Sequence, residues 1–527
     1  MTDPIEVARA HCSGRTFEHL NDLTVRGLRT HADTVLLRAA DGKTYTGAAI
    51  EGEIARYAAV LEKEGVSLGV RVALLAGNSV GVLFIQQAVS VLGGVFTPLH
   101  PLGAPSDFAY MISDAEIDII IVDAARRQEI ETAARLSRRS VRIFTLGGGS
   151  EHDLVGRAQR EEAVRIELRP IDPEAICRIV YTGGTTGVPK AAQSSYRAMS
   201  TMYGIELADW EWPDEIRQLL VAPLSHVGAV CFTPTVARGG CLFVESGFDP
   251  IRVLSLIESE RITCMLMVPT MIGMILDHPR LSEFDVSSLE TIFYGASPIS
   301  PARLREAIAH FGPIFFQFYG QAEAITTVTV MRRDEHDLTS DERLGSCGRP
   351  VPEMAVRLLD PDGNEVPDGE PGELCVRGPL LMSGYLNRPK ETAEAFRGGW
   401  LHTGDIAIRD GDGFLRLVDR AKDLVITGGF NVFPRAVEDV LETHPAVAAA
   451  SVFGLPDDRW GEIVVAAIVR RDGDVEASDL IAYVRERKGA VQAPKRVEFL
   501  DQIPLTAVGK PDKKALRLMF SQEASPA

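Results

Sequence analysis

The chain has 527 residues, of which 45% are hydrophobic and 24% are charged, so it is long enough for two or more domains and has the composition of an ordinary globular protein. Its formal net charge of −18 argues against a nucleic-acid surface, for which a clustered basic patch would be expected. The seven cysteines show no Cys-x-x-Cys pair and no metal-like Cys/His spacing, which favours a reducing, cytoplasmic location over a disulfide framework. The first residues lack a basic start followed by an apolar run, so we expect no signal peptide.

The first 150 or so residues predict strands that alternate with helices. No charged side chain occurs from Val72 to Ser106, which raises the question of a membrane span, but Asn78, Gln86, glycines and prolines interrupt the stretch. Its short apolar runs instead indicate a buried strand–helix–strand unit with both faces of the sheet covered. The elements expected here are a strand at Val70–Leu75, a helix at Val80–Leu92, and strands at Val95–Leu99, Ala115–Val122 and Val141–Leu146.

The same rhythm continues to about residue 340 and predicts layered α/β structure. Beyond it Gly, Pro and Asp become frequent between short strands, and roughly the last hundred residues form a small α+β pattern of their own. We therefore expect an α/β fold with a large N-terminal domain of layered α/β subdomains, residues 1–421, and a small mobile α+β C-terminal domain, residues 422–527. The elements expected in these parts are strands at Ile176–Tyr181, Cys264–Pro269, Leu289–Tyr294, Val447–Val452, Ile463–Val469 and Arg496–Leu500, and helices at Arg252–Arg261, Pro434–Thr443 and Ala477–Lys488.

The segment from Ile179 to Lys190 is the most informative part of the chain. A short apolar strand leads into a loop of glycines and threonines that ends in one lysine. Glycines let the backbone approach an anion and point N–H groups at it, while hydroxyls and a lysine add donors and a mobile charge suited to phosphate. The plain alternative is a Gly/Thr-rich turn between two strands. The loop is not a P-loop, because that pattern needs Ser or Thr directly after the lysine and here Ala191 follows.

The loop instead resembles the phosphate loop of the adenylate-forming superfamily, which includes acyl-CoA synthetases and the adenylation domains of peptide synthetases. That family usually shows Tyr-Thr-Ser-Gly-Thr-Thr-Gly-x-Pro-Lys-Gly, so Gly183 replaces the serine and Ala191 the last glycine, while the lysine and the two central threonines are kept. Further segments similar to the family's motifs follow in the family's order over essentially the whole chain. They are Pro223–Ala229, Tyr294–Pro298, Phe315–Glu323, His402–Asp405, Asp419–Pro434 and Pro504–Lys510.

The resemblance implies a set of contacts to the nucleotide and to CoA. Tyr319 would stack on adenine, and Glu323 would hold Mg²⁺ together with Thr186; an aromatic face suits a purine and hard oxygen ligands suit Mg²⁺. Asp405 and Arg420 would bind the ribose hydroxyls. The full set implied in cofactor binding is Thr182, Gly183, Gly184, Thr185, Thr186, Gly187, Lys190, Gly295, Ala296, Ser297, Gln317, Tyr319, Gly320, Gln321, Ala322, Asp405, Arg420, Lys422, Gly428, Gly429 and Lys510.

The resemblance also implies a moving C-terminal domain. Lys422 falls at the family's hinge, and Gly428 and Gly429 fall where a backbone loop lines the pantetheine tunnel. Lys510 would bridge the substrate carboxylate and the α-phosphate as charge builds during adenylation. His226 matches a position that lines the acyl pocket and gates the thiol, although a histidine beside apolar residues is often a core group. The residues with implied catalytic roles are Lys510, Lys190, Glu323 and His226.

Two further positions depart from the family's pattern. Ala322 stands where a threonine usually touches the α-phosphate, although some aryl-acid adenylating members also carry alanine there. Gln492, before Pro494, stands where a lysine is common, so a CoA phosphate contact there would fall to Lys495 or Arg496. The departure at Gln492 leaves open whether the thiol acceptor is CoA or a carrier protein.

The resemblance implies an ATP-dependent, AMP-forming acyl-CoA synthetase, an acid–thiol ligase that uses ATP, Mg²⁺ and CoA. Three alternatives are a ligase that loads a separate carrier-protein phosphopantetheine, a degenerate member that binds without turnover, and a phosphotransferase, which would need a base motif that we do not find. The expected partners are small molecules, with no nucleic acid and no membrane span, and a homo-oligomer is compatible with the sequence. Mostly small pocket candidates leave room for a medium-chain, aryl or alicyclic acid; they are His226, Val227, Gly228, Gly295, Gly320 and Thr327.

Overall fold

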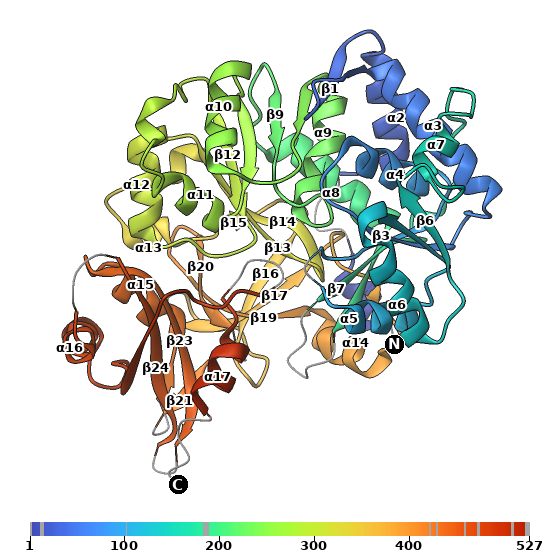
Figure 1. Ribbon diagram of the computed structural model, residues 1–527. Helices are drawn as coiled ribbons and strands as arrows, with labels where there is room; N and C mark the ends of the chain where they lie inside the picture. Colours follow the sequence, from blue (N-terminus) through green and yellow to red (C-terminus); the bar gives the residue numbers. More distant parts are fainter. Residues whose placement is uncertain are drawn as a thin grey trace.

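The structure is a computed structural model that describes residues 3–10, 15–101, 103–182, 189–420, 423–427, 430–457, 460–471, 475–506 and 511–521, apart from the side chains of residues 420 and 431. Figure 1 shows a large body formed by the first four fifths or so of the chain and a smaller red lobe formed by the last part. The expected division into a large N-terminal and a small C-terminal domain is confirmed. The boundary between residues 421 and 422 stays a prediction.

The uncharged stretch near residue 72 is core structure, as predicted. β3 and β4 run parallel, and the helix between them, α4 (Val80–Val91), buries Leu83 and Ile85 completely. In the described ranges no helix is long and apolar enough to cross a membrane. The sheet has the order β18–β8–β7–β4–β3–β5–β6, formed by β3 (Arg71–Leu75), β4 (Val95–Pro98), β5 (Ile119–Asp123), β6 (Arg142–Leu146), β7 (Ile176–Thr182), β8 (Lys190–Ser195) and β18 (Gly384–Tyr385).

One strand of this sheet begins later than its apolar run suggests. The prediction placed a strand at Ala115–Val122, but β5 begins at Ile119, because Ala115 caps α5 (Pro105–Asp114) and Glu116 turns the chain with a φ of 45°. Ile117 is fully buried without belonging to the strand. An apolar run therefore marks burial here, and only its second half marks a strand.

A second sheet forms the other half of the body and has the order β15–β14–β13–β12–β11–β9–β10–β1–β2 in the described part of the chain. Its central strands from β10 to β13 are parallel, and β13 and β14 form an antiparallel hairpin. The strands are β1 (Val35–Ala39), β2 (Thr44–Thr46), β9 (Arg217–Leu220), β10 (Cys241–Val244), β11 (Cys264–Met267), β12 (Thr291–Gly295), β13 (Phe315–Gln321), β14 (Ala324–Met331) and β15 (Arg349–Pro350).

Helices cover both sheets, and one of them lies between the two. α8 (Tyr196–Asp209) contacts β8 of the first sheet and β14 of the second, and most of its side chains are buried. α10 and α12 begin at prolines whose preceding Asp249 and Ser300 side chains accept a backbone N–H of the first turn, which is the usual N-terminal signal. The other longer helices of the body are α2 (Leu20–Thr30), α3 (Gly47–Lys63), α6 (Arg127–Ser137), α10 (Pro250–Glu260), α11 (Pro269–Leu276) and α12 (Pro301–Phe311).

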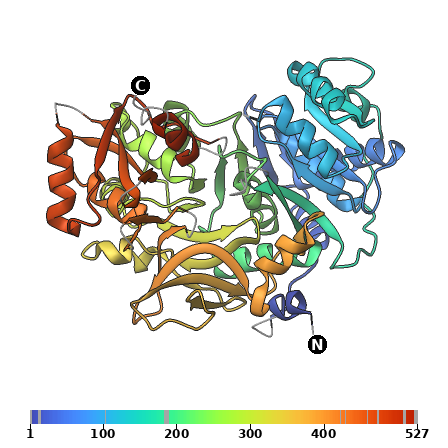
Figure 2. The ribbon, with the colours of Figure 1, turned by 90° about the horizontal axis from the view of Figure 1, so that it is seen from below.

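A small antiparallel sheet closes the body before the C-terminal lobe. It has the order β16–β17–β19–β20 and lies along the lower edge in Figure 2, in gold to orange. Its last strand ends at Arg420, directly before the predicted hinge. The strands are β16 (Ala355–Leu359), β17 (Pro371–Arg377), β19 (Leu401–Arg409) and β20 (Leu415–Arg420).

The C-terminal lobe is an α+β unit, as predicted, and the structure shows that it has its own apolar clusters. β23 and β24 form a long hairpin, and β25 adds to β24 in parallel. β23 extends to Asp457, five residues beyond the predicted end at Val452, because it pairs with β24 along its whole length. The elements are β21 (Val425–Thr427), β22 (Phe430–Val432), β23 (Val447–Asp457), β24 (Gly461–Arg470), β25 (Arg496–Leu500), α15 (Pro434–Glu442), α16 (Ala477–Lys488) and α17 (Lys513–Ser521).

Candidate active site

The predicted phosphate lysine and the predicted metal carboxylate meet at one tyrosine. Lys190 opens β8, and its Nζ lies 5.1 Å from the centre of the Tyr385 ring. The Tyr385 hydroxyl donates a hydrogen bond to Glu323 Oε1 at 2.9 Å. Burial, and then the charge of Glu323, raises the pKa of Tyr385, so its hydroxyl keeps the proton that it donates. The fold thus brings a cation suited to phosphate and a carboxylate suited to Mg²⁺ to one side chain.

Tyr385 was not predicted from the sequence. It lies in β18, which pairs with β8, whereas Glu323 lies in the turn between β13 and β14 of the other sheet. The backbone N–H of Met382 donates to the Glu323 carbonyl oxygen at 2.9 Å and ties this turn to the segment that leads into β18. Because these contacts join segments far apart in the chain, no local pattern around Tyr385 could have indicated its place.

The glycine-rich loop connects two antiparallel strands. Thr182 at the end of β7 faces Lys190 at the start of β8, and the Thr182 hydroxyl donates to the Lys190 carbonyl oxygen at 3.3 Å. The hairpin agrees both with a phosphate loop and with a plain turn. The predicted loop residues Gly183, Gly184, Thr185, Thr186 and Gly187 lie outside the described residues.

The predicted adenine and ribose residues are hydrogen-bonded to each other. The Tyr319 hydroxyl donates to Asp405 Oδ2 at 2.6 Å, and both side chains are almost fully buried. Burial and the charge of Asp405 raise the pKa of Tyr319, which keeps its proton on the phenol. Gln317, also in β13, has a buried Oε1 without a hydrogen-bond partner among the described residues. An aromatic ring, a carboxylate and an unpaired amide oxygen fit the ring, the ribose hydroxyls and the amino group of adenosine.

Strand register places the second predicted ribose residue opposite the first. Asp405 in β19 pairs with Arg420 in β20, although the Arg420 side chain lies outside the described part of the chain. Gln321 Nε2 donates to the Thr403 carbonyl oxygen at 3.4 Å, which links the β13 end to the same turn. Tyr319 and Gln321 of β13 therefore lie beside Asp405 of β19, which pairs with Arg420 of β20.

The small residues on the predicted adenine side are required by packing. A Cβ on Gly295 would come within 2.3 Å of the Phe318 carbonyl oxygen, and one on Gly320 within 2.8 Å of the backbone of Thr326. Ala296 follows in the left-handed region with a φ of 65°, and Ser297 continues the bend. The close approach of β12 to β13 at Gly295, and of β13 to β14 at Gly320, explains these glycines without a ligand.

The same holds for the predicted acyl pocket. A Cβ on Gly228 would lie 2.3 Å from the Ala222 carbonyl oxygen, so backbone occupies the space beside this glycine too. Thr327 is fully buried in β14 with a φ of 78°, and its Oγ1 accepts a hydrogen bond from Trp210 Nε1 at 3.0 Å. A β-branched residue in this region of φ is rare and costs roughly 1–3 kcal/mol of strain. The glycines thus give no support for a wide pocket, whereas Thr327 marks a strained position beside it.

His226 is held by residues of the uncharged stretch. Asn78 Nδ2 donates to the Ala222 carbonyl oxygen at 2.9 Å, and Asn78 Oδ1 accepts the Leu224 N–H at 2.8 Å. His226 Nδ1 lies 2.9 Å from Ser225 Oγ, and its ring lies edge-on to His100 at 4.7 Å between centres. The polar interruptions of the apolar run therefore fix the loop that presents His226.

The remaining predicted residues divide into two groups. Ala322 packs against the main core, and Gln492 has a buried Oε1 that makes no hydrogen bond within the described ranges. Gln492 therefore does not offer the charge that a lysine would. The predicted hinge, tunnel and catalytic residues of the C-terminal lobe lie outside the described residues; they are Lys422, Gly428, Gly429 and Lys510.

Comparison with known proteins identifies the family. The family model of AMP-binding enzymes matches residues 25–386, and the model of the AMP-binding enzyme C-terminal domain matches residues 436–510. The chain belongs to the AMP-binding enzymes, the adenylate-forming superfamily. It is 44% identical, over 98% of its length and 93% of the relative's, to the medium/long-chain-fatty-acid–CoA ligase FadD8 of Mycobacterium tuberculosis. It is 38% identical to feruloyl-CoA synthase of an Amycolatopsis species, over 91% of this chain and 94% of that one.

These similarities place the chain in the acyl-CoA synthetase branch, whose members use ATP, Mg²⁺ and CoA. Among solved structures, ATP-bound MatB from Rhodopseudomonas palustris superposes with a TM-score of 0.88 at 28% identity, over 96% of this chain and 100% of MatB. MatB without ligand superposes with a TM-score of 0.76 at the same identity and coverage.

Proposed function

We propose that this acyl-CoA synthetase forms an acyl adenylate at the site where Lys190, Tyr385 and Glu323 meet. A carboxylate oxygen of the acid attacks the α-phosphorus of ATP, the bond from that phosphorus to the β-phosphate bridging oxygen breaks, and pyrophosphate leaves. Lys190 holds the departing phosphates, and Glu323 provides an oxygen ligand for Mg²⁺, which neutralises charge on the phosphates when bound. The convergence of Lys190 and Glu323 on Tyr385 is the observation that carries this proposal.

Adenosine is held by the second cluster. Tyr319 presents its ring to the base, Gln317 Oε1 accepts from the adenine amino group, and Asp405 accepts from the ribose hydroxyls. The hydrogen bond from Tyr319 to Asp405 fixes both groups before the nucleotide arrives, so little ordering is left for binding.

The second half-reaction transfers the acyl group to CoA. We assign residues 1–421 and 422–527 to two domains that turn relative to each other about Lys422. Lys510 steadies the α-phosphate during adenylation and then withdraws, while Gly428 and Gly429 turn toward the thiol. The CoA sulfur attacks the acyl carbon, the bond to AMP breaks, and the thiol proton passes to solvent. The higher TM-score with ATP-bound than with unliganded MatB supports an arrangement close to the nucleotide-bound one.

The acid is proposed from the relatives. The 44% identity to a medium/long-chain-fatty-acid–CoA ligase favours a medium- or long-chain fatty acid, and the 38% identity to feruloyl-CoA synthase makes a hydroxycinnamic acid the second candidate. We also propose a cytoplasmic location, which the six described cysteines support because all are free thiols.

The test measures AMP and pyrophosphate from Mg-ATP with fatty acids of graded length and with ferulate, each with and without CoA. We expect acid-dependent AMP formation that rises with CoA and falls at least about a hundredfold in Lys510→Ala. Lys514→Ala is the matched control, because Lys514 is an exposed lysine of the same segment. Pyrophosphate formation that CoA does not accelerate would instead indicate a carrier-protein acceptor, and silence across the panel would contradict the proposal.

A further inference from the structure

The predicted ribose carboxylate lies on a bulge of β19. Glu373 in β17 pairs with Ile406, and Cys375 pairs with His402. Leu374 alone therefore stands opposite the three residues 403–405, which end in Asp405. Bulges of this kind re-aim side chains and are over-represented next to active sites. The direction of the Asp405 side chain thus depends on whatever holds the bulge in shape.

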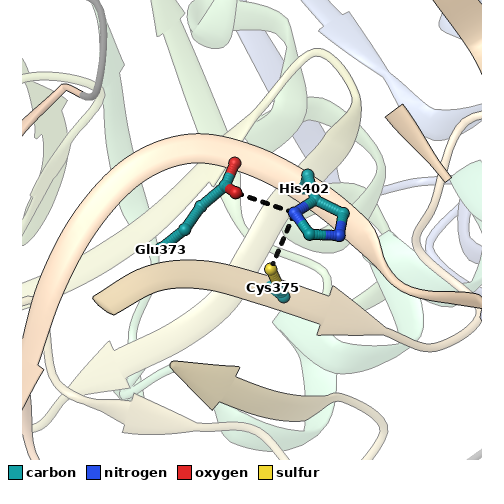
Figure 3. Close-up of side chains that lie close together, drawn as sticks. All are labelled: Glu373, Cys375 and His402. Atoms are coloured by element: carbon teal, nitrogen blue, oxygen red, sulfur yellow. Dashed lines mark hydrogen bonds and ion pairs between the residues drawn. The ribbon is translucent and has the colours of Figure 1, made fainter. Parts of the chain in front are cut away.

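Glu373 holds this bulge at both of its ends. Its Oε2 lies 2.7 Å from His402 Nδ1, the residue before the bulge, and its Oε1 accepts the backbone N–H of Gly404 within the bulge at 3.1 Å. Arg397 donates to the same Oε2 at 2.8 Å and fixes the carboxylate from the outside. Figure 3 shows Glu373 and Cys375 from one strand facing His402 of the next.

A second set of hydrogen bonds carries this shape to Asp405. The Thr403 hydroxyl donates to the Leu374 carbonyl oxygen at 2.6 Å and accepts the Asp405 N–H at 3.1 Å. Gly404 adopts a φ of 72°, a conformation that L side chains rarely adopt. The carboxylate of Asp405 in turn accepts a hydrogen bond from the Tyr319 hydroxyl. The backbone N–H groups of Gly404 and Asp405 therefore each have a defined acceptor.

We propose that Glu373, together with His402, is a positioning residue that holds the bulge so that Asp405 meets the ribose hydroxyls of ATP. The inference rests on the ribose role proposed for Asp405. Glu373 does not touch the nucleotide; it acts through the Gly404 N–H and the His402 ring. Removing its carboxylate leaves the Gly404 N–H without its acceptor and lets the bulge relax. Asp405 then moves away from the position in which it meets the ribose hydroxyls.

The charge state of Glu373 agrees with this role. Burial favours its neutral form, but the hydrogen bond and charge of His402, the charge of Arg397 and the Gly404 N–H together hold the pKa of Glu373 below its usual value. The carboxylate is therefore ionised at neutral pH and accepts from all three donors.

A metal ion is the alternative occupant of this cluster, since ligand atoms of Glu373, Cys375 and His402 lie within 4.8 Å of one another. Two observations argue against it. Both Glu373 oxygens already accept hydrogen bonds, and one of them faces the cation of Arg397. Burial, and then the charge of Glu373, raises the pKa of the Cys375 thiol, whereas a metal needs the thiolate.

The experiment compares ATP with 2′-deoxy-ATP in the wild type and in variants, using the acid found active in the panel above. We expect Glu373→Ala to raise the KM for ATP about 10- to 100-fold and to reduce the preference for ATP over 2′-deoxy-ATP, with the KM values for acid and CoA unchanged. Glu373→Gln retains an oxygen for the Gly404 N–H and should recover part of the preference. The control is Glu394→Gln, which removes the other partner of Arg397 at an exposed position and should leave both values unchanged.

Asp405→Ala separates the inference from the function on which it rests. If Asp405→Ala keeps the preference for ATP, the ribose role itself is wrong. If Asp405→Ala abolishes the preference while Glu373→Ala, shown to be folded by circular dichroism, keeps it, the positioning role is wrong. Stoichiometric zinc in the purified protein that is lost in Cys375→Ser would also overturn the inference in favour of a metal centre.

Discussion

The side chain of Glu206 is a buried acid without a hydrogen-bond partner among the described residues, and its substitution should stabilise the protein. It lies on α8 between the two sheets, is fully buried, and neither carboxyl oxygen accepts or donates a hydrogen bond within the described part of the chain. Burial raises the pKa of Glu206 well above its ordinary value of 4.5. The neighbouring titratable groups include Tyr203 and Cys231, neither of which supplies a positive charge.

The sign of the pH dependence follows from whether the folded or the unfolded state keeps the Glu206 proton. Above about pH 4.5 the unfolded chain loses the Glu206 proton, whereas the folded protein keeps it until the pH reaches the raised pKa. In this window unfolding releases a proton, so the free energy of unfolding falls by about 1.4 kcal/mol per pH unit. Glu206→Gln has no such proton, so in this window the variant should gain on the wild type by about 1.4 kcal/mol for each pH unit.

Urea denaturation at several pH values, followed by tryptophan fluorescence, measures this difference. Trp212 is a local probe, because its Nε1 donates to the Glu206 carbonyl oxygen at 2.8 Å. Glu206→Met tests the same point without a polar group, and Glu215→Gln is an exposed control that should show no such trend. A stability difference that does not change with pH, or that favours the wild type more as the pH rises, would refute the reasoning and indicate an ionised, paired Glu206.

Three further substitutions have defined outcomes. Tyr385→Phe keeps the ring beside the lysine but removes the hydrogen bond to Glu323, so we expect a several-fold higher Mg²⁺ concentration for half-maximal rate, measured in a Mg²⁺ titration of AMP release. Asn78→Ala leaves two backbone groups of the His226 loop unpaired; it should lower the free energy of unfolding by about 1–3 kcal/mol and raise the KM for the acid. Gly348→Ala should lower the free energy of unfolding by about 4 kcal/mol, measured in a thermal melt, or prevent folding altogether. The reason is that the added Cβ would lie 1.9 Å from a carbonyl oxygen of β14.

The sequence predicted the fold class and the two-domain plan because both depend on local pattern. The apolar run near Val72 became a strand–helix–strand unit through turn residues that lie within it. The strand predicted from Ala115 was wrong in its first half, because buried residues that follow a helix cap give the same apolar pattern in a sequence as buried residues of a strand. The small residues near the predicted pocket show a different limit of reasoning from the sequence. Gly228 is small because backbone crosses it, and a sequence does not distinguish that cause from room for a ligand.

The predicted site residues came from ordered motifs, but their mutual contacts did not. Tyr319 and Asp405 belong to separate sheets, and only the fold shows that one donates to the other. Tyr385 and Glu373 were missed altogether, because each acts through a strand pairing or a bulge rather than through a recognisable motif. What a sequence omits is thus chiefly the second layer, the groups that orient the residues which the motifs supply.

That second layer also joins the predicted nucleotide site to the predicted hinge. Asp405 pairs with Arg420, the last residue of β20, and the preceding residue, Asp419, accepts the backbone N–H of Arg435 at the start of α15 at 3.1 Å. The predicted hinge at residue 422 lies between Asp419 and Arg435, so we expect a turn of the C-terminal domain about that hinge to break this hydrogen bond. β20 carries the predicted ribose residue Arg420, and through Asp419 it also caps a helix of the predicted C-terminal domain. We therefore expect nucleotide contact and domain arrangement to be coupled through β20, and this coupling would be a physical reason why adenylation and thioester formation can share one site.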